Sequence, residues 1–468
     1  MLRGLSTRFL MLAVLFSRVF VNLCGGTSPA LTSKSIINPP KRVFKPSVRT
    51  SAERQEQLHH DGLHWRARNH APRSSHLFGV CLTLVFAIDA IFPPLTGIGR
   101  YAFELARRLP QVHDMGELKF LSMWGWGQSL NDLSDKGLSS QTLMVREAFG
   151  RTRRWLAAKP WAIGPYDAVS DRWRGHLLRS AHGAVYHSPN FFLSPHDGPS
   201  VATVHDLSVT RYPETHPEAR RRYFELAFER SLSRATKLIT VSETVRQELM
   251  ADYGVPADRV QAVLNGVDSV FRPMTEVDTL PALRARGLRH GGYTLSVATV
   301  EPRKKLDKLI TAYAKLPAPL RQAYPLVLIG SLGWLSSPVQ RLIEQASSQG
   351  WLRFLGYVSQ AELPVLYSGA RGYAMTSIYE GFGLPVLEAM ASGIPVLTSS
   401  VSCMPEVADG AALLAYPDDI DQLTDQLTRL LTDDEWRLQA VPRGLARARE
   451  LSWERCLEQT VQVYRSVA

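Results

Sequence analysis

The sequence predicts an α/β protein with two doubly wound parallel-sheet domains that face each other across a cleft. Short apolar runs of the buried-strand type alternate with segments of helical periodicity, and this alternation occurs twice along the chain. In each series a glycine-rich loop follows a strand and opens a helix, at residues 97–99 and again at residues 381–383. With 468 residues, the chain is long enough for two or three domains.

The first 80 residues are expected to be a disordered or leader-like segment outside the two domains. Residues 9–23 are apolar, but Arg18 interrupts them and they are shorter than the roughly 20 residues that a membrane-spanning helix needs. Residues 27–77 are rich in Ser, Pro, Arg and His and have no hydrophobic periodicity. A non-conforming leader, or sequence translated upstream of the true start, is favoured over a working export signal.

Much of the positive charge of the chain lies in this segment. The net charge is +11, but residues 1–80 carry 12 Lys/Arg and 3 Asp/Glu, so that residues 81–468 carry only +2. The charge therefore says little about nucleic-acid binding by the folded domains. Four scattered cysteines form no CxxC pair, which argues against a disulfide framework or a zinc site and fits a reducing compartment. They are Cys24, Cys81, Cys403 and Cys456.

Residues 81–272 are predicted to form the first domain. Its first strand, residues 82–89, is an apolar run that leads through a Pro/Gly loop into a helix at residues 100–109. Further strands are expected at residues 184–187, 200–205, 238–242 and 260–264, with a helix near residues 217–234.

The second domain is predicted at residues 290–446, after a linker at residues 273–289 that lacks a strong pattern. Its strands are expected at residues 293–298, 326–330, 351–355, 372–376 and 395–399, and its helices at residues 306–314, 339–347, 363–368 and 385–391. Residues 447–468 are expected to form a C-terminal helix that packs back on the first domain. Open parallel sheets bind ligands at the carboxyl ends of their strands, which is where functional residues are expected.

The most informative stretch follows a strand of the second domain and reads EGFGLPVLEAMASG from Glu380 onwards. Glu380 lies in a glycine-rich loop, and Glu388 lies eight residues later in the following helix. Gly381 and Gly383 leave room for backbone amides to approach a ligand, and the helix start presents N–H groups to an anion. This arrangement suits a sugar diphosphate, with one carboxylate on sugar hydroxyls and the other on ribose hydroxyls. The alternative is a solvated helix on which the two glutamates occur by chance and bind no ligand.

Cations follow the first strand of the second domain, in the sequence EPRKK at residues 301–305. Arg303 and Lys304 can neutralise a leaving diphosphate, although solvated Lys/Arg pairs are common on protein surfaces. The Asp-x-Asp match at residues 419–421 opens a helical pattern and indicates helix capping rather than a metal site. No metal ion or other cofactor is expected, because the cations would stand in its place.

Two further candidates lie in the first domain. His205 ends a strand in the sequence TVHDL, where it can donate to a sugar hydroxyl or hold the acceptor, although a lone histidine is more often structural. Gly97 and Gly99 follow the first strand in a loop that is not a dinucleotide fingerprint, and an ordinary tight turn is the alternative. Asn190 and the Ser-Pro turn before it are weaker candidates for the same position.

A basic and aromatic stretch occupies residues 146–179, where Arg and Lys alternate with Trp155, Trp161 and Trp173. This composition suits a membrane surface that bears a lipid-diphosphate acceptor. It also suits nucleic acid, but no nucleic-acid motif accompanies it. A solvated basic surface that binds neither membrane nor nucleic acid explains the composition equally well.

Further motifs join the E-x7-E stretch across residues 83–468. They are IDAIFPPLTGIGRYAFEL, TVHDL, TVSETVRQEL, NGVD, VATVEPRKKLDKL, GYVSQAELPVLYSGA and LSWERC. Together they resemble the retaining family 4 glycosyltransferases of the GT-B fold. The resemblance implies that Glu388 binds the donor ribose and that Glu380 faces the transferred sugar. It also implies that the backbone of Phe382, Gly383 and Leu384 contacts sugar and phosphate.

The same resemblance strengthens the other candidates. His205 is similar to the active-site histidine of the family, and the loop of Gly97 and Gly99 is similar to one that approaches the donor phosphates and the acceptor. Two positions depart from the family pattern. Lys305 stands where this branch more usually has Asn, and Ala298 stands where arginine or glycine is frequent.

The implied activity is hexosyl transfer with retention of the anomeric configuration, in which the departing diphosphate helps to deprotonate the acceptor hydroxyl. The motifs look most like the mannosyl/rhamnosyl branch that builds bacterial surface polysaccharides, so GDP-mannose is the first choice of donor and UDP-hexose stays open. The expected acceptor is a glycan or a polyprenyl-diphosphate-linked sugar, and the expected location is cytoplasmic, with or without peripheral contact with the inner face of the membrane. No nucleic-acid partner is expected. The rival interpretations are a nucleotide-sugar epimerase or phosphorylase, and a non-catalytic sugar-binding assembly subunit.

Overall fold

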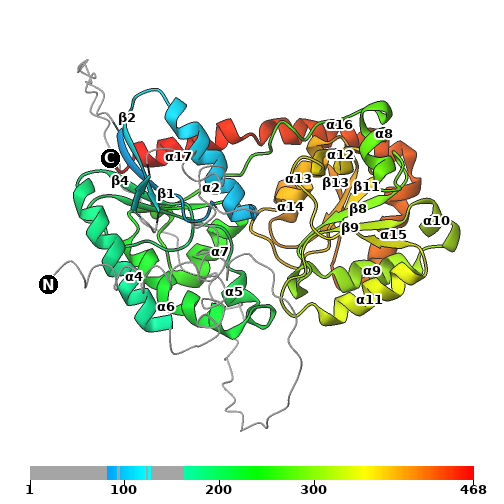
Figure 1. The fold of residues 1–468 in the computed structure, drawn as a ribbon, viewed down its shortest axis with the longest axis horizontal. Helices are drawn as coiled ribbons and strands as arrows, with labels where there is room; N and C mark the ends of the chain where they lie inside the picture. The colour runs from blue at the N-terminus through cyan, green and yellow to red at the C-terminus, as the bar shows by residue number, and fades with distance from the viewer. Residues whose placement is uncertain (1–81, 92–94, 123–124, 128–162) are drawn as a thin grey trace, which may run out of the picture. The chain divides into compact units, whose positions relative to one another are not determined.

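The computed structural model describes residues 82–91, 95–122, 125–127 and 163–468 (Figure 1). The segment at residues 1–80, and residues 146–162 of the basic and aromatic stretch, lie outside the described residues. The described chain contains two sheets, each with its own set of helices. None of the described helices is long and apolar enough to cross a membrane.

The first sheet has the strand order β3-β2-β1-β4-β5-β6-β7. Its strands run parallel except for the edge strand β3, which pairs antiparallel with β2. The strands are β1 Leu82–Ala87, β2 Met115–Ser122, β3 Gly125–Gly127, β4 Val185–Ser188, β5 Ser200–Val204, β6 Lys237–Thr240 and β7 Val260–Ala262. The helices are α2 Gly97–Arg108, α4 Ile163–Leu178, α5 Ser208–Arg211, α6 Glu218–Arg234 and α7 Glu243–Tyr253. The strand order reverses between β1 and β4, which marks a ligand-binding position at their carboxyl ends.

The second sheet is parallel throughout, with the order β10-β9-β8-β11-β12-β13. The strands are β8 Thr294–Val297, β9 Leu326–Ile329, β10 Leu352–Phe354, β11 Gly372–Ala374, β12 Val396–Ser399 and β13 Ala412–Ala415. The helices are α8 Glu276–Ala285, α9 Leu306–Lys315, α10 Ala318–Ala323, α11 Ser337–Ser348, α12 Leu363–Ser368, α13 Leu384–Ala391, α14 Met404–Ala408, α15 Ile420–Thr432 and α16 Asp434–Glu450. The last helix, α17 Trp453–Arg465, packs in the core of the first sheet. The order reverses between β8 and β11, so the two loops with the candidate cations and Glu380 follow adjacent strands.

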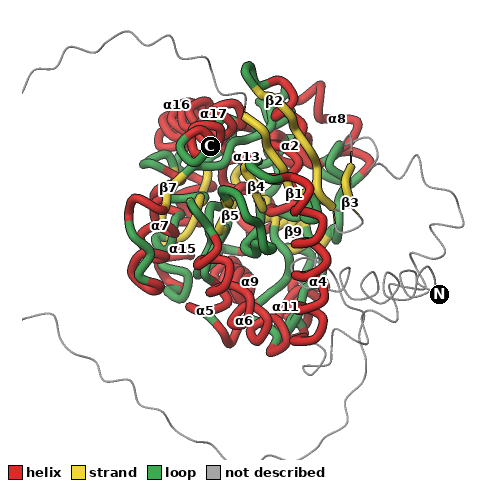
Figure 2. The backbone as a smooth tube through the Cα atoms, turned by 90° about the vertical axis from the view of Figure 1, so that its left-hand side faces the viewer, coloured by secondary structure: helices red, strands yellow, loops and turns green. Residues whose placement is uncertain are grey.

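Alternate strand residues enter separate cores on the two faces of each sheet, as the two-residue period of a strand requires. In β1, Phe86 packs with α2 and α17, whereas Val85 packs with the aromatic cluster of α6. In β9, Leu328 packs with α9, α11 and α15, whereas Val327 packs with α12 and α13. Figure 2 shows the helices distributed around the strands. Both sheets are therefore covered on both faces, which explains their near-continuous apolar strands.

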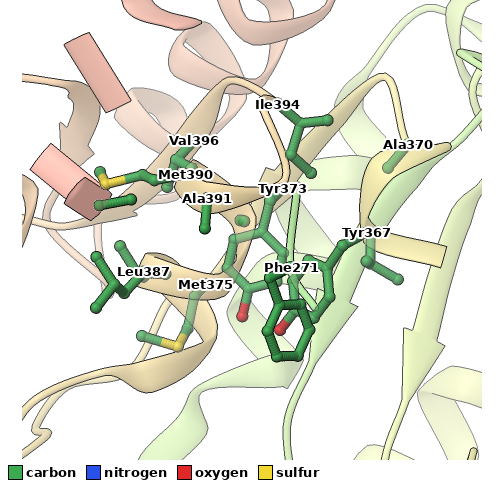
Figure 3. Close-up of a cluster of buried hydrophobic side chains, with 14 of the residues drawn as sticks. Phe271, Tyr367, Ala370, Tyr373, Met375, Leu387, Met390, Ala391, Ile394 and Val396 are labelled. Atoms are coloured by element: carbon green, nitrogen blue, oxygen red, sulfur yellow. The ribbon is translucent and has the colours of Figure 1, made fainter. Parts of the chain in front are cut away.

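Part of the second core is closed by the segment that leaves the first half (Figure 3). Phe271 is 5% exposed, and its ring contacts the ring of Tyr367 edge-on at 5.5 Å. Tyr367 in turn lies beside Tyr373 at 5.6 Å, and both tyrosines are fully buried. The apolar core thus continues up to helix α13, which carries Glu388.

Residues 273–289, expected to be a linker, contain helix α8. Thr275 and Asp278 form a capping box at its start, and Leu283 is fully buried in the second core. Pro281 lies inside this helix. Proline is rare inside helices, so the sequence pattern of α8 looked irregular.

The end of the chain crosses back to the first half. Residue 447, the expected start of the C-terminal helix, lies within α16, and a separate helix, α17, follows. Trp453 and Tyr464 of α17 are buried in the core that includes β1. The Tyr464 hydroxyl lies 2.6 Å from Nδ1 of His187 on β4, which ties the C-terminal helix to the first sheet.

Strands β2, β3 and β13 were not predicted from the sequence. Strand β2 is exposed near its start, at Gly116 and Glu117, and buried only near its end, at Phe120 and Leu121. It lies next to the edge of the sheet and lacks the continuous apolar run by which the other strands are recognised. Strand β3 has only three residues, which is too short for a pattern.

Candidate active site at the carboxyl ends of the strands

The glycine-rich loop after β11 shapes the start of helix α13. Gly383 precedes the helix with a φ of 93°, a left-handed conformation that favours glycine. A Cβ at this position would lie 2.5 Å from Cε of Met404. Pro385 occupies the first turn, where its missing N–H costs nothing. The free N–H groups of this helix start are therefore available to an anion.

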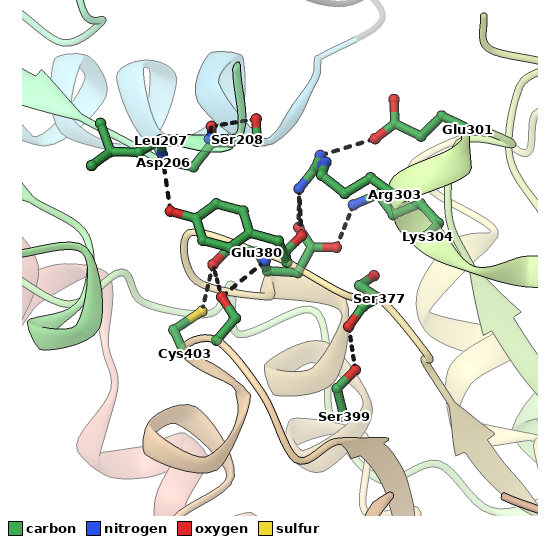
Figure 4. A network of polar contacts seen from close by, with 12 residues as sticks. Asp206, Leu207, Ser208, Glu301, Arg303, Lys304, Ser377, Glu380, Ser399 and Cys403 are labelled. Atoms are coloured by element: carbon green, nitrogen blue, oxygen red, sulfur yellow. Dashed lines mark hydrogen bonds and ion pairs between the residues drawn. The ribbon is translucent and has the colours of Figure 1, made fainter. Parts of the chain in front are cut away.

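Glu380 is held by two cations from the loop after β8 (Figure 4). Its carboxylate lies 2.5 Å from Nζ of Lys304 and 3.1 Å from Nη1 of Arg303. Burial alone would raise the pKa of Glu380, but these two charges outweigh it and hold the pKa below its usual range. All three side chains are largely buried, so the attraction is screened less than at a surface. The structure thus brings Arg303, Lys304 and Glu380 into direct contact.

Arg303 makes further contacts that orient its guanidinium group. Nη2 donates to Glu301 at 2.9 Å, and Nη1 donates to the carbonyl oxygen of Tyr379 at 2.7 Å. The next residue, Lys305, points elsewhere, with Nζ 2.9 Å from the carboxylate of Asp418. The adjacent side chains of Lys304 and Lys305 therefore contact different carboxylates.

His205 lies at the end of β5 as a buried, neutral side chain. Its Nε2 lies 2.9 Å from the carbonyl oxygen of Pro189, which can only accept, so Nε2 carries the proton. The imidazole packs edge-on against Tyr101 at 5.0 Å and against Phe191 at 5.8 Å. Burial lowers the pKa of His205 to about 4, so Nδ1 carries a lone pair at neutral pH.

The backbone of His205 touches the loop of Glu380 directly. A Cβ at Gly381 would overlap the carbonyl oxygen of His205 and would lie 3.1 Å from Cβ of Asp206. Asp206 accepts hydrogen bonds from the N–H and the hydroxyl of Ser208. Burial disfavours its charge, but Arg303 opposes this effect and lowers the pKa of Asp206 to about 2. The two halves of the protein therefore meet at the candidate site.

Tyr379 fixes this meeting point through hydrogen bonds of its hydroxyl group. Its hydroxyl accepts a hydrogen bond from the N–H of Leu207 at 3.0 Å and donates to Glu248 at 2.5 Å. Tyr379 is only 2% exposed, and it directly precedes Glu380 in the chain. The side chain thus anchors the Glu380 loop to the segment that carries His205. Tyr379 was not predicted as a site residue from the sequence, although its position beside Glu380 was the available signal.

We expect Tyr379→Phe to lower kcat/KM by about tenfold, because the buried N–H of Leu207 loses its acceptor at a cost of about 1–3 kcal/mol. The matched control is Tyr357→Phe, since Tyr357 is exposed on the same half. Steady-state kinetics of both variants would check this expectation. Equal kcat/KM in the wild type and Tyr379→Phe would show that the anchor has no influence on the site.

The glycine loop of the first half reaches the same place. Thr96 caps helix α2 by accepting from the N–H of Gly99 at 3.2 Å. A Cβ at Gly99 would lie 2.8 Å from the carbonyl oxygen of Ala90, so glycine permits a tight turn here. A Cβ at Gly97 would lie 4.0 Å from Cδ1 of Leu384 on α13. Gly97 therefore faces the start of the donor-site helix predicted from the sequence.

Glu388 lies on α13, one turn beyond the glycine-rich loop. Burial raises the pKa of Glu388 to about 7, against the opposing influence of the nearby Tyr367 hydroxyl and of the charge of Arg100. Phe382, by contrast, is 4% exposed and packs in the core, so only its backbone is free to meet a ligand.

This pKa predicts a pH dependence of donor use. A carboxylate accepts hydrogen bonds from hydroxyl groups better than the protonated acid does, and Glu388 takes up its proton as the pH falls through about 7. We expect kcat/KM for the donor to fall by up to about tenfold per pH unit below that value. In Glu388→Gln the fall should disappear, while the overall kcat/KM is lower. A pH profile of donor kcat/KM that is identical in both proteins would contradict the assignment.

Asn190 and Asp419 have structural roles. The side chain of Asn190 accepts from the N–H of Phe191 at 2.9 Å and so shapes a turn. Asp419 caps helix α15 by accepting from the N–H of Gln422 at 3.0 Å, as the sequence indicated. Within the described residues, no group of three or more His, Cys, Asp or Glu side chains is placed to hold a metal ion.

Comparison with known proteins identifies the family. The chain matches the family described as Glycosyltransferase Family 4 over residues 95–271 and the one described as Glycosyl transferases group 1 over residues 289–446. The O-antigen chain mannosyltransferase B of Escherichia coli is 38% identical over 384 residues, which cover 82% of this chain and 100% of that protein. This chain belongs to glycosyltransferase family 4. It is a hexosyltransferase, as the motifs predicted.

Other relatives of this family 4 glycosyltransferase agree. The O-antigen chain mannosyltransferase RfbU of Salmonella typhimurium is 29% identical over 238 residues, 48% of this chain and 62% of that protein. The solved structure of WaaG, a glycosyltransferase involved in lipopolysaccharide biosynthesis, superposes with a TM-score of 0.62 at 17% identity and covers 81% of this chain and 99% of its own. Anabaena HepE in complex with UDP and glucose gives a TM-score of 0.59 at 16% identity, over 82% of this chain and 100% of its own. The predicted GT-B fold is confirmed.

Proposed function

We propose that this glycosyltransferase transfers mannose from GDP-mannose to a glycan acceptor during the synthesis of a bacterial surface polysaccharide. The support for mannose is the similarity over the full length of an O-antigen chain mannosyltransferase, together with the similarity to RfbU. The observation that carries the chemistry is the contact of Arg303 and Lys304 with Glu380, beside the start of α13 and the segment of His205.

The donor diphosphate fits between the N–H groups at the start of α13 and the cations Arg303 and Lys304. In the free enzyme, Glu380 neutralises these cations. When the diphosphate takes over this role, the carboxylate of Glu380 is free to accept hydrogen bonds from hydroxyl groups of the transferred sugar. Negative charge builds on the diphosphate as it leaves, so the cations stabilise the transition state more than the ground state.

Transfer with retention proceeds on one face of the sugar. The bond between C1 and the diphosphate oxygen breaks, the bond between C1 and the acceptor oxygen forms, and the acceptor proton moves to the departing diphosphate. His205 is a poor base because its pKa is about 4 and its Nε2 proton is committed to Pro189. The lone pair on Nδ1 instead suits a hydrogen bond from a sugar hydroxyl.

The acceptor that we propose is a glycan carried on a polyprenyl diphosphate at the cytoplasmic face of the membrane. Helix α4 and the turn after it contain the described part of the basic and aromatic stretch, where Arg172 of the helix and Arg179 of the turn are exposed. Exposed arginines are attracted to anionic lipid headgroups. Flotation with anionic liposomes should carry the protein with the lipid, and recovery in the soluble fraction alone would overturn the membrane contact.

A donor screen on the full-length chain tests the proposal. GDP-mannose and a set of UDP-hexoses would be offered with a mannose-terminated glycan, and release of nucleoside diphosphate would be measured. We expect release from GDP-mannose alone, and an α-linked mannose in the product by NMR. Preference for a UDP-hexose would refute the donor assignment, and an inverted anomer would refute the same-face mechanism.

A further inference from the structure

Three consecutive arginines at the start of α6 differ in their partners. Arg222 is exposed and forms an ion pair with Glu218 at 2.6 Å. Across the described chain, neither Arg220 nor Arg221 has a carboxylate within ion-pair distance. Both are partly buried, and Nε of Arg221 is a buried donor without an acceptor. A partly buried guanidinium group that makes no close ion pair is costly, so both arginines are available to bind an anion.

Arg220 is held in place by the second half of the protein. Its guanidinium carbon lies 5.3 Å from the ring centroid of Trp334, in a cation–π contact. The indole N–H of Trp334 donates to the carbonyl oxygen of Thr215 at 2.5 Å, which fixes the ring against the segment before α6. The ring of His216 lies 5.9 Å from the same indole. Arg220 thus has a defined position where the two halves meet.

A chain of hydrogen bonds connects this place to the candidate active site. Nε2 of His216 lies 3.0 Å from the hydroxyl oxygen of Ser208, and that hydroxyl donates to Asp206 at 2.7 Å. Burial and the nearby charge of Arg220 lower the pKa of His216 to about 4, so this histidine adds no charge of its own. The charge of Arg220 also acts on Asp206, directly after His205. The charge of Arg221 acts on His216 as well, so both arginines provide positive charge beside this chain of hydrogen bonds.

This charge lies on a different half from the donor site. Arg303, Lys304 and the start of α13 belong to the second half and already suit the donor diphosphate. Arg220 and Arg221 belong to the first half, on the side of His205. Arginine binds phosphate oxygens in fork geometry, and the N–H groups at the start of a helix such as α6 add to the attraction.

We propose that Arg220 and Arg221 form a subsite for the phosphate group of the acceptor, namely the diphosphate that links the glycan to its lipid carrier. This inference rests on the proposed transfer to a lipid-linked glycan and adds the residues that select it. Trp334 positions Arg220, and the subsite is complete only when the two halves are in contact.

The test compares two acceptors that differ in charge. The first probe is a mannose-terminated disaccharide on a short alkyl diphosphate, and the second is the same disaccharide as an uncharged alkyl glycoside. Titration calorimetry on the full-length chain is expected to show at least tenfold tighter binding of the charged probe. In the double variant Arg220→Gln/Arg221→Gln the preference should disappear, with binding of the uncharged probe and KM for GDP-mannose unchanged. Arg222→Gln, one residue further along, should retain the full preference.

Three outcomes would overturn the subsite. In the first, the wild type binds both probes with equal affinity. In the second, the double variant loses as much affinity for GDP-mannose as for the charged probe. In the third, it loses binding to anionic liposomes but retains its affinity for the charged probe. If the double variant does not fold, the single variants Arg220→Gln and Arg221→Gln are each expected to lose part of the preference. Absence of mannose transfer to either probe would refute the proposed function separately, because the comparison of binding needs no turnover.

Discussion

Replacement of Lys304 with glutamine is expected to lower kcat by about a hundredfold or more, since removal of one group that stabilises transition-state charge typically costs about 3–4 kcal/mol. The ammonium group contacts Glu380 at 2.5 Å at a largely buried position, where the diphosphate would leave. Glutamine retains much of the side-chain volume and a hydrogen-bond donor but removes the charge. The measurement is single-turnover transfer with saturating donor, which separates the chemical step from donor binding.

The neighbouring lysine provides the control for this prediction. Lys305 pairs with Asp418 and not with Glu380. We expect Lys305→Gln to change kcat by less than about twofold, because partly exposed ion pairs contribute little. Equal losses of kcat in both variants would indicate a general effect of charge. An unchanged kcat in Lys304→Gln would show that this residue does not stabilise the transition state.

Substitution of Gly381 with alanine is expected to abolish most activity, because the added methyl group would overlap the carbonyl oxygen of His205. The two residues belong to different halves, so the clash should separate the halves without unfolding either one. A displacement of about 1 Å in a catalytic group is enough to cost about a hundredfold in rate. Transfer assays with circular dichroism would show a loss of activity of at least that size with retained secondary structure.

Gly175→Ala is the matched control for this substitution. A Cβ at Gly175 would lie 3.4 Å from Pro195, which is an ordinary contact, and the residue lies inside helix α4. We expect this variant to retain wild-type activity, because alanine favours a helix over glycine. Wild-type transfer by Gly381→Ala would show that the two halves need not approach closely during catalysis.

The amino-acid sequence alone determined the architecture and the main candidate residues. Buried parallel strands produce continuous apolar runs, and the turns that follow them need glycine, so both are visible in local patterns. The cations at Arg303 and Lys304 and the carboxylate of Glu380 follow strands β8 and β11, which are neighbours in the sheet. The strand order of a doubly wound sheet brings such loops together. Their contact could therefore be expected from residue type and position.

The contacts between the two halves could not be predicted from the sequence. Tyr379 bonds to Leu207 and Glu248, and Trp334 covers Arg220, each across more than a hundred residues of chain. No local periodicity encodes such pairs. The raised pKa of Glu388 likewise depends on burial by distant segments. Long-range packing creates both effects, because it sets which side chains lose water and which charges become neighbours.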